Sequence, residues 1–204
     1  HVANTDGMDI CNSTNVLVEH CFVPCADDGI CIKSLGHCPR PAQNITVRDC
    51  TVVSVMNAFK VGTETGHDVR NVLVENCHFC MPDIYPGSVC GITLVSCDGT
   101  NLQNVTLRRI TMDKVVCPLY ICLNMRNRYK DPYSDTVGAN RYWGGSISNI
   151  TIEDVRATDV ELPSIVTGFV AQRHDGQPVR QPVRNLQIKN FRVVYRDNEE
   201  QVAI

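Results

Sequence analysis

The sequence predicts an all-β protein, a right-handed parallel β-helix that forms a single domain over residues 1–204. Three observations predict this fold. A strand pattern occurs six times, each copy alternates aliphatic and polar residues, and each copy breaks that alternation at the same place. Such a repeat forms a solenoid, in which each unit buries its apolar side chains against its neighbours.

Each copy begins with an asparagine, has aliphatic residues one and three positions later, and has a charged residue at the fourth position. Alternation with a period of two is typical of a half-buried strand. Helical repeats would have spacings of three and four, and leucine-rich repeats would have shorter and more regular periods. The copies lie 27 to 45 residues apart, at residues 15–21, 44–50, 71–77, 104–110, 149–155 and 185–191.

The sixth residue after each asparagine is apolar, although strict alternation would place an apolar residue at the fifth. We therefore expect the chain to bend or bulge after the charged residue and to re-enter the core on a new face. The leading asparagine tolerates the unusual backbone of a corner, and it can stack on the asparagine of the next coil.

The remaining elements follow in chain order. We expect a second strand and turn at 57–66, further strands at 91–96 and 117–124, and insertions at 36–41 and 80–88. The longest interruption, at 125–145, is basic and aromatic, and a loop of this size in a compact solenoid is often functional.

Composition excludes some classes of partner. The net charge of -3 and the pI near 6.1 give no reason to expect nucleic acid or an acidic membrane as a partner, because both require a basic face. No run of 18 apolar residues is present, so nothing in the sequence predicts a membrane span. The sequence opens inside what looks like an ongoing motif, so we expect N-terminal coils of a longer protein to be missing.

Twelve cysteines allow two interpretations, a disulfide framework or free thiols in the core. Cys21, Cys50 and Cys77 occupy the repeat position that later holds Ile110 and Val155. Cysteine at such a position behaves as a small buried hydrophobe, which favours free thiols. The cysteine spacing does not fit a zinc site.

Asp6 is separated by about one coil of chain from the adjacent pair Asp27 and Asp28, and Asp27 stands 21 positions after Asp6. Neighbouring strands lie about 4.8 Å apart, so the three carboxylates would share one patch of surface. Crowded carboxylates cannot all ionise freely, and a protonated acid beside a charged base is what glycoside hydrolysis requires. The alternative is that Asp-Gly and Asp-Asp-Gly are turn signals in which glycine takes a positive φ.

The Asn-Thr-Asp-Gly motif at 4–7, the Asp-Asp-Gly-Ile-Cys-Ile-Lys-Ser motif at 27–34 and the Asn-led strands together resemble glycoside hydrolase family 28, the polygalacturonase-like right-handed β-helix enzymes. The resemblance implies an inverting hydrolase of pectin-type polysaccharides or oligosaccharides, with Asp27 as general acid and with Asp6 and Asp28 deprotonating the attacking water. It implies no metal or organic cofactor. We further expect a monomer in a secreted or periplasmic location, without nucleic-acid or membrane partners.

The chain departs from the family pattern at two places. Asn57-Ala58 stands where the family has His-Gly, and Thr93-Leu94-Val95 stands where it has Arg-Ile-Lys, so the cations that hold a galacturonate carboxylate are missing.

Four cations elsewhere are candidates for substrate binding: Lys33, Lys60, Arg126 and Arg128. If Ile32 points inward, Lys33 lies on the outer side, where it binds substrate or is simply solvated. Lys60 binds substrate or pairs with Glu64, and the two arginines bind substrate or form a solvated cluster.

Two other functions stay open. A carbohydrate-binding or adhesin β-helix would keep the scaffold without catalysis, and a polysaccharide lyase would need a basic residue as proton acceptor. We expect no such basic residue beside the acids, which ranks the lyase last.

Overall fold

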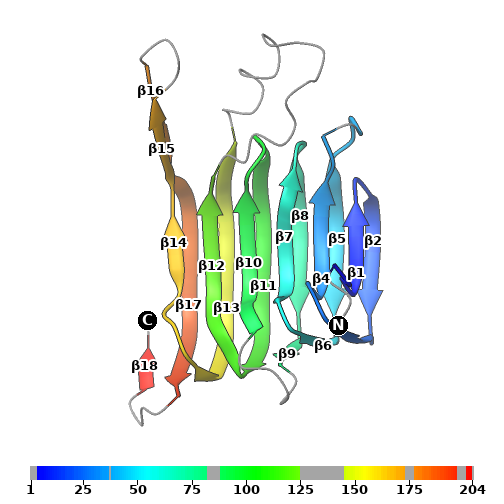
Figure 1. Cartoon of the computed structure of the whole chain (residues 1–204), viewed down its shortest axis with the longest axis vertical. Coiled ribbons are helices and arrows are strands. Elements are labelled where there is room, and N and C mark those ends of the chain that lie inside the picture. Colours follow the sequence, from blue (N-terminus) through cyan, green and yellow to red (C-terminus); the bar gives the residue numbers. More distant parts are fainter. Residues whose placement is uncertain are drawn as a thin grey trace.

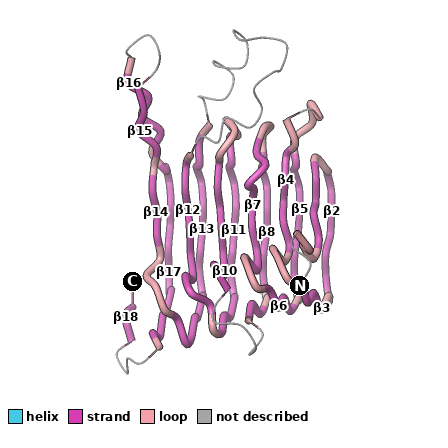
Figure 2. The backbone as a smooth tube through the Cα atoms, viewed as in Figure 1, coloured by secondary structure: helices cyan, strands magenta, loops and turns pink. Residues whose placement is uncertain are grey.

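The computed structural model describes residues 4–36, 38–81, 88–124, 145–172, 177–196 and 201–203, and all its regular elements there are strands. The strands stack in two long layers along the molecule, from the first coil to the last (Figures 1 and 2). The predicted parallel β-helix is confirmed. No described helix has the length and apolar character that crossing a membrane would need.

One layer is a six-stranded parallel sheet with one strand from each coil. Its order follows the chain, so residues from successive coils lie side by side. The strands are β1 (Met8–Cys11), β4 (Ile30–Ser34), β7 (Asn57–Thr65), β10 (Ser88–Ser96), β12 (Val115–Leu123) and β14 (Ile165–Thr167).

The second layer contains the six Asn-led repeats. In the first three coils a short strand follows each repeat strand, whereas in later coils one long strand continues through the bend. The strands are β2 (Thr14–Glu19), β3 (Phe22–Cys25), β5 (Ala42–Arg48), β6 (Thr51–Ser54), β8 (Val69–Glu75), β9 (His78–Cys80), β11 (Asn101–Asp113), β13 (Ser146–Val160) and β17 (Val183–Tyr195). Antiparallel pairs occur only late in the described chain, where β18 (Gln201–Ala203) joins β17, and β15 (Phe169–Gln172) pairs with β16 (Pro178–Gln181).

The predicted bend lies where the repeat changes phase. Each leading asparagine has a positive φ, and so does the residue five positions later, as at Asn44 (56°) and Asp49 (54°). The asparagine side chains form the expected ladder, with Nδ2 of each donating to Oδ1 of the asparagine in the preceding coil over 2.9–3.2 Å. Because every coil turns at the same two positions, the repeat strands keep their register through both corners, and the register between β13 and β17 shifts only beyond them, between Ala157 and Val160.

Aliphatic side chains stack between the layers. Ile32, Val61, Leu94 and Ile121 are register partners on four successive strands, and each is fully buried. A fully buried side chain of this kind contributes about 1.5–3 kcal/mol. The core therefore fixes which residues of the six-stranded sheet point inward and which point outward.

None of the twelve cysteines, all of which lie among the described residues, forms a disulfide, as expected for Cys21, Cys50 and Cys77 from their repeat position. Cys50 and Cys77 are buried at adjacent corners of the ladder, and burial raises the pKa of Cys77 to about 12. These thiols act as small core side chains.

Candidate active site

The candidate site lies on the outer face of the six-stranded sheet. One row of register partners crosses this face from coil to coil, and its chemical character changes along the way. The row reads Asp9, Cys31, Lys60, Thr93, Tyr120 and Ile165. Asp9 and Lys60 carry charges on the first and third strands, and Lys33, two residues after Cys31, adds one on the second. The last three residues of the row are mainly apolar.

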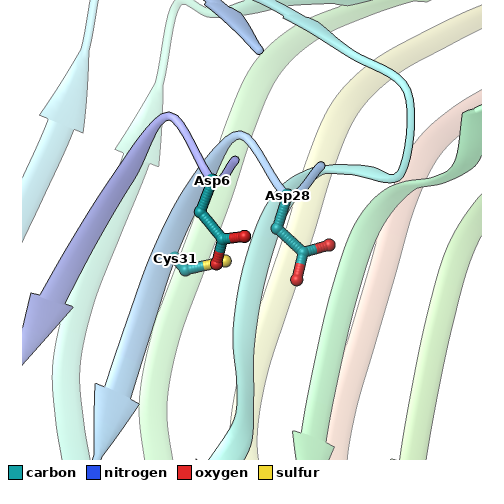
Figure 3. A group of neighbouring side chains, drawn as sticks. All are labelled: Asp6, Asp28 and Cys31. Carbon is teal, nitrogen blue, oxygen red and sulfur yellow. The ribbon is translucent and has the colours of Figure 1, made fainter. Parts of the chain in front are cut away.

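Asp6 and Asp28 lie in stacked turns just before β1 and β4. The Gly7 N–H donates to the Asp28 carbonyl over 2.8 Å, and Met8 is the register partner of Ile30 two residues further on. Both carboxylates point to the same side, as Figure 3 shows. One ligand atom from each of Asp6, Asp28 and the Cys31 thiol lies within 4.8 Å of the other two. The predicted convergence therefore holds for Asp6 and Asp28.

The glycines after these aspartates are needed for close packing. A Cβ at Gly29 would collide with the Val52 side chain and the Ala58 carbonyl, and one at Gly7 would collide with Val23. Neither glycine has a positive φ, so the alternative explanation of these motifs as turns with left-handed glycine was wrong in its geometry. The motif brings two acid-bearing turns into backbone contact.

Asp28 is the most buried of the three acids, with 6 % of its surface exposed. Its Oδ2 accepts a hydrogen bond from Lys60 Nζ over 2.7 Å, and its Oδ1 accepts one from Asn57 Nδ2 over 2.5 Å. The Thr93 hydroxyl in turn donates to Asn57 Oδ1 over 2.7 Å. Every oxygen of the Asp28 carboxylate therefore has a fixed donor, and a charge this deeply buried requires such compensation.

Asp6 shares its cation with another acid. Lys33 Nζ donates to Asp6 Oδ2 over 2.8 Å and to Asp9 Oδ2 over 2.7 Å, and Glu64 lies 4.0 Å from the same nitrogen. Burial opposes the charge of Lys33, but the two carboxylates outweigh it and raise the pKa of Lys33 above its usual value. Burial raises the pKa of Asp9, although Lys33 partly offsets this.

Asp27 lies one residue out of the register that pairs Asp6 with Asp28. Its Oδ2 accepts the Asn4 N–H over 3.1 Å, and its Oδ1 accepts the Asp28 N–H over 2.8 Å. A carboxylate offers about four acceptor positions, so both oxygens keep one for another partner. Within the described ranges, no lysine or arginine lies within ion-pair distance of Asp27. Asp6 and Asp28 thus each have an ammonium partner, and Asp27 has backbone donors.

The four predicted binding cations fall into two groups. Lys33 lies on the outer side as expected, since Ile32 is buried, and Lys60 pairs with Asp28 rather than with Glu64, so that proposed pair was wrong. The expectation that no basic residue lies beside the acids was also wrong. Arg126 and Arg128 lie outside the described residues.

Three residues of the site were missed by the sequence analysis. Asn57 was read only as the place of a missing histidine, yet it holds Asp28 and links it to Thr93. Asp9 was missed because its role depends on where Lys33 points. Cys31 was treated as one of many core thiols, although it lies beneath Asp6 (Figure 3).

Among the described residues, Asp6, Asp28 and Cys31 have donor atoms close enough together to be considered as a metal site. Their donor atoms do not fit one well, because both carboxylates already bind ammonium groups. Burial, followed by the charge of Asp28, raises the pKa of Cys31 far above its usual value, which keeps the thiol protonated.

Beyond Asn57 and Lys60 the outer face becomes apolar around a cavity of about 390 Å³. We call the first part, formed by Asp6, Asp9, Asp27, Asp28, Lys33, Lys60 and Glu64, the charged half. We call the second part, formed by Val89, Val95, Val116, Tyr120, Leu162 and Ile165, the apolar half.

Comparisons with known proteins identify the family of the chain. The family model for Glycosyl hydrolases family 28 matches residues 1–167. A protein of Arabidopsis thaliana named "Probable polygalacturonase" is 32% identical over 125 residues, which is 58% of this chain and 24% of the relative. The match thus spans about a quarter of that relative's length. The search of solved structures found no match to this chain. From the extent of the family match, the chain belongs to glycosyl hydrolase family 28.

Proposed function

We propose that the protein is an inverting glycoside hydrolase that cleaves pectin-type polysaccharides or oligosaccharides at the charged half. The observation that carries the proposal is the pairing of Asp6 and Asp28 on adjacent coils, where Lys33 binds Asp6 and Lys60 binds Asp28, with Asp27 next to Asp28 in the chain. Family membership and the similarity to a protein named as a polygalacturonase support the same chemistry.

The cation partners suggest the roles of the acids. Ammonium groups at 2.7–2.8 Å stabilise the charges of Asp6 and Asp28, which suits them to accept a proton from a water between them. Asp27 has no such cation among the described residues and keeps free acceptor positions, so it serves as the acid that protonates the leaving oxygen. The water then attacks from the opposite side of the sugar, and the anomeric configuration inverts.

A polysaccharide lyase is the second candidate, because Lys33 and Lys60 now supply basic groups near the acids. Their geometry favours hydrolysis, since each ammonium is hydrogen-bonded to a carboxylate and would have to lose that partner to act as a base. A non-catalytic carbohydrate-binding protein would not need three aspartates with separate partners.

Turnover by the 204-residue chain and its Asp27→Asn variant tests the proposal. Oligogalacturonides and rhamnogalacturonan fragments are incubated with each protein, and new reducing ends are measured. We expect reducing ends without ultraviolet-absorbing unsaturated products, and a loss of about 10²–10⁴-fold in the variant. Asp49→Asn is the control, because Asp49 lies in the corner ladder away from the site. Equal turnover by Asp27→Asn and the parent would overturn the assignment.

A secreted or periplasmic location, a monomeric state and substrate contacts by Arg126 and Arg128 stay predictions.

A further inference from the structure

The apolar half borders the acids directly. Asn57 and Lys60 line its cavity and also hold Asp28, so a ligand in the cavity would extend from the acids along the outer face. The floor is formed by buried side chains, including Thr93 and Val95, while Val89, Leu162 and Ile165 stand 42–51% exposed around it. Three large, exposed apolar side chains around one cavity are typical of a binding surface.

The charges on this face disfavour a carboxylate in the cavity. Of the described lining residues, Lys60 alone carries a charge at neutral pH, and its ammonium is bonded to Asp28 at 2.7 Å. The neighbouring charged half contains five carboxylates and two ammonium groups. A ligand carboxylate would lose its water, meet no free cation among these residues and be repelled by the acids next to it.

The lining also disfavours a ligand that buries many hydroxyls. Asn57, Lys60 and Thr93 use hydrogen-bonding groups on one another and on Asp28, and Thr63 adds one more hydroxyl to the lining. Cys90 and Cys117 are weak hydrogen-bonding groups, and the valines offer none. Tyr120 supplies a ring face on which the apolar side of a sugar can lie. A hydrogen bond with Cys122 and burial raise the pKa of Tyr120 to about 12, so the ring stays uncharged.

We propose that the apolar half is a subsite for a glycosyl unit that has no free carboxylate and presents a methyl group, an inference that rests on the proposed hydrolase function. Two kinds of unit share this chemistry, a methyl-esterified uronate and a 6-deoxyhexose. Bond cleavage then takes place between this unit and its neighbour over the acids, and the enzyme selects where along a mixed chain it cuts.

Binding measurements on the 204-residue chain distinguish the two kinds of glycosyl unit. Calorimetric titration is done with three oligosaccharides of equal length: a free-acid oligogalacturonide, its methyl ester, and a rhamnogalacturonan fragment that contains 6-deoxyhexose units. We expect the methyl ester or the 6-deoxyhexose fragment to bind more tightly than the free acid, and the tighter of the two identifies the natural unit. Equal or tighter binding of the free acid would overturn the inference, and so would the absence of binding by all three.

A pair of variants tests the location. Ile165→Lys places a cation at the cavity, whereas Val166→Lys places one at the next residue of β14, which has similar exposure (45% against 42%) and does not line the cavity. Ile165→Lys should strengthen free-acid binding about fivefold, the upper range for a partly exposed ion pair, and Val166→Lys should leave it unchanged. Equal effects of the two variants would overturn the location.

Failure of the proposed function gives a different result. If the binding preferences hold but no oligosaccharide is cleaved, the subsite stands and the hydrolase assignment falls. If the free acid is both bound best and cleaved, the hydrolase assignment stands and the subsite falls.

Discussion

The charged and apolar halves of the outer face rest on the same inner face but differ in how their polar groups are satisfied. Under both halves the inward side chains are buried aliphatics in register, such as Ile32 and Ile121. On the outside, the charged half has a network in which lysines, carboxylates and Asn57 bind one another, whereas the apolar half leaves large side chains exposed. A coil can therefore change its outer chemistry without changing the core that specifies the fold.

The largest expected difference concerns catalysis. Asp28→Asn, which removes the charge but keeps the shape, should lower turnover by about 10²–10⁴-fold, because an amide cannot accept the proton from water. Turnover is measured as reducing ends, with circular dichroism as the check of folding. The control variant Asp49→Asn, at a corner outside both halves, should keep turnover within a few-fold. Similar losses in both variants would contradict the assignment of catalysis to the charged half.

The next effect is on stability. Lys60→Met leaves the buried Asp28 carboxylate without its cation, so the free energy of unfolding at pH 7 should fall by about 3 kcal/mol. Urea denaturation measures this change. The double variant Lys60→Met/Asp28→Asn should recover most of the loss, because no uncompensated charge remains. Additive losses in the double variant would show that the ion pair is not the cause.

Thr93 lies on the boundary between the halves and gives a smaller effect. Thr93→Val leaves Asn57 Oδ1 without its donor in a buried place, which should cost about 1–2 kcal/mol of unfolding free energy. Thr93→Ser, which keeps the hydroxyl, should restore most of it. A valine variant as stable as the parent would show that the hydrogen bond from the Thr93 hydroxyl to Asn57 does not stabilise the site.

The smallest expected effect is the contribution of Asp9 to the pH dependence of the unfolding free energy. Because its pKa is raised in the folded protein, the folded state binds this proton more readily than the unfolded chain. Asp9 therefore contributes stability that grows as the pH falls from neutral through the folded pKa, and this contribution is lost at neutral pH. Asp9 is more than a third exposed, so the difference should stay below about 1 kcal/mol. Unfolding of the parent and of Asp9→Asn between pH 7 and pH 4 measures it, and a parent that loses stability relative to Asp9→Asn as the pH falls would contradict the sign.

Much of the fold could be predicted because the repeat encodes it locally. The phase change between Glu19 and Cys21, and in each later copy, places the positive φ at the residue between them, and the aligned asparagines give the ladder. The same repeat indicated core thiols rather than disulfides at Cys50 and Cys77, which stand where other coils have aliphatic residues.

The site could be predicted only in part. The motif spacing located Asp6, Asp27 and Asp28, but a register one residue longer than the expected 21 pairs Asp6 with Asp28 and turns Asp27 toward backbone donors. The partners of Lys33 and Lys60 depend on which coil lies next to which, so no local pattern indicates them. For the apolar half, the sequence signal was the absence of the family's cations at Thr93 and Val95. The residues that line its cavity come from segments as distant as Val89 and Ile165, so no local pattern indicates the cavity.

The most direct test of the hydrolytic charged half is proton NMR of the first product formed by the chain from an α-linked oligogalacturonide methyl ester or rhamnogalacturonan fragment. We expect the new reducing end to appear first as the β anomer and Asp27→Asn to abolish this signal. An α anomer as the first product, or an unsaturated product formed by elimination, would contradict inverting hydrolysis by the charged half.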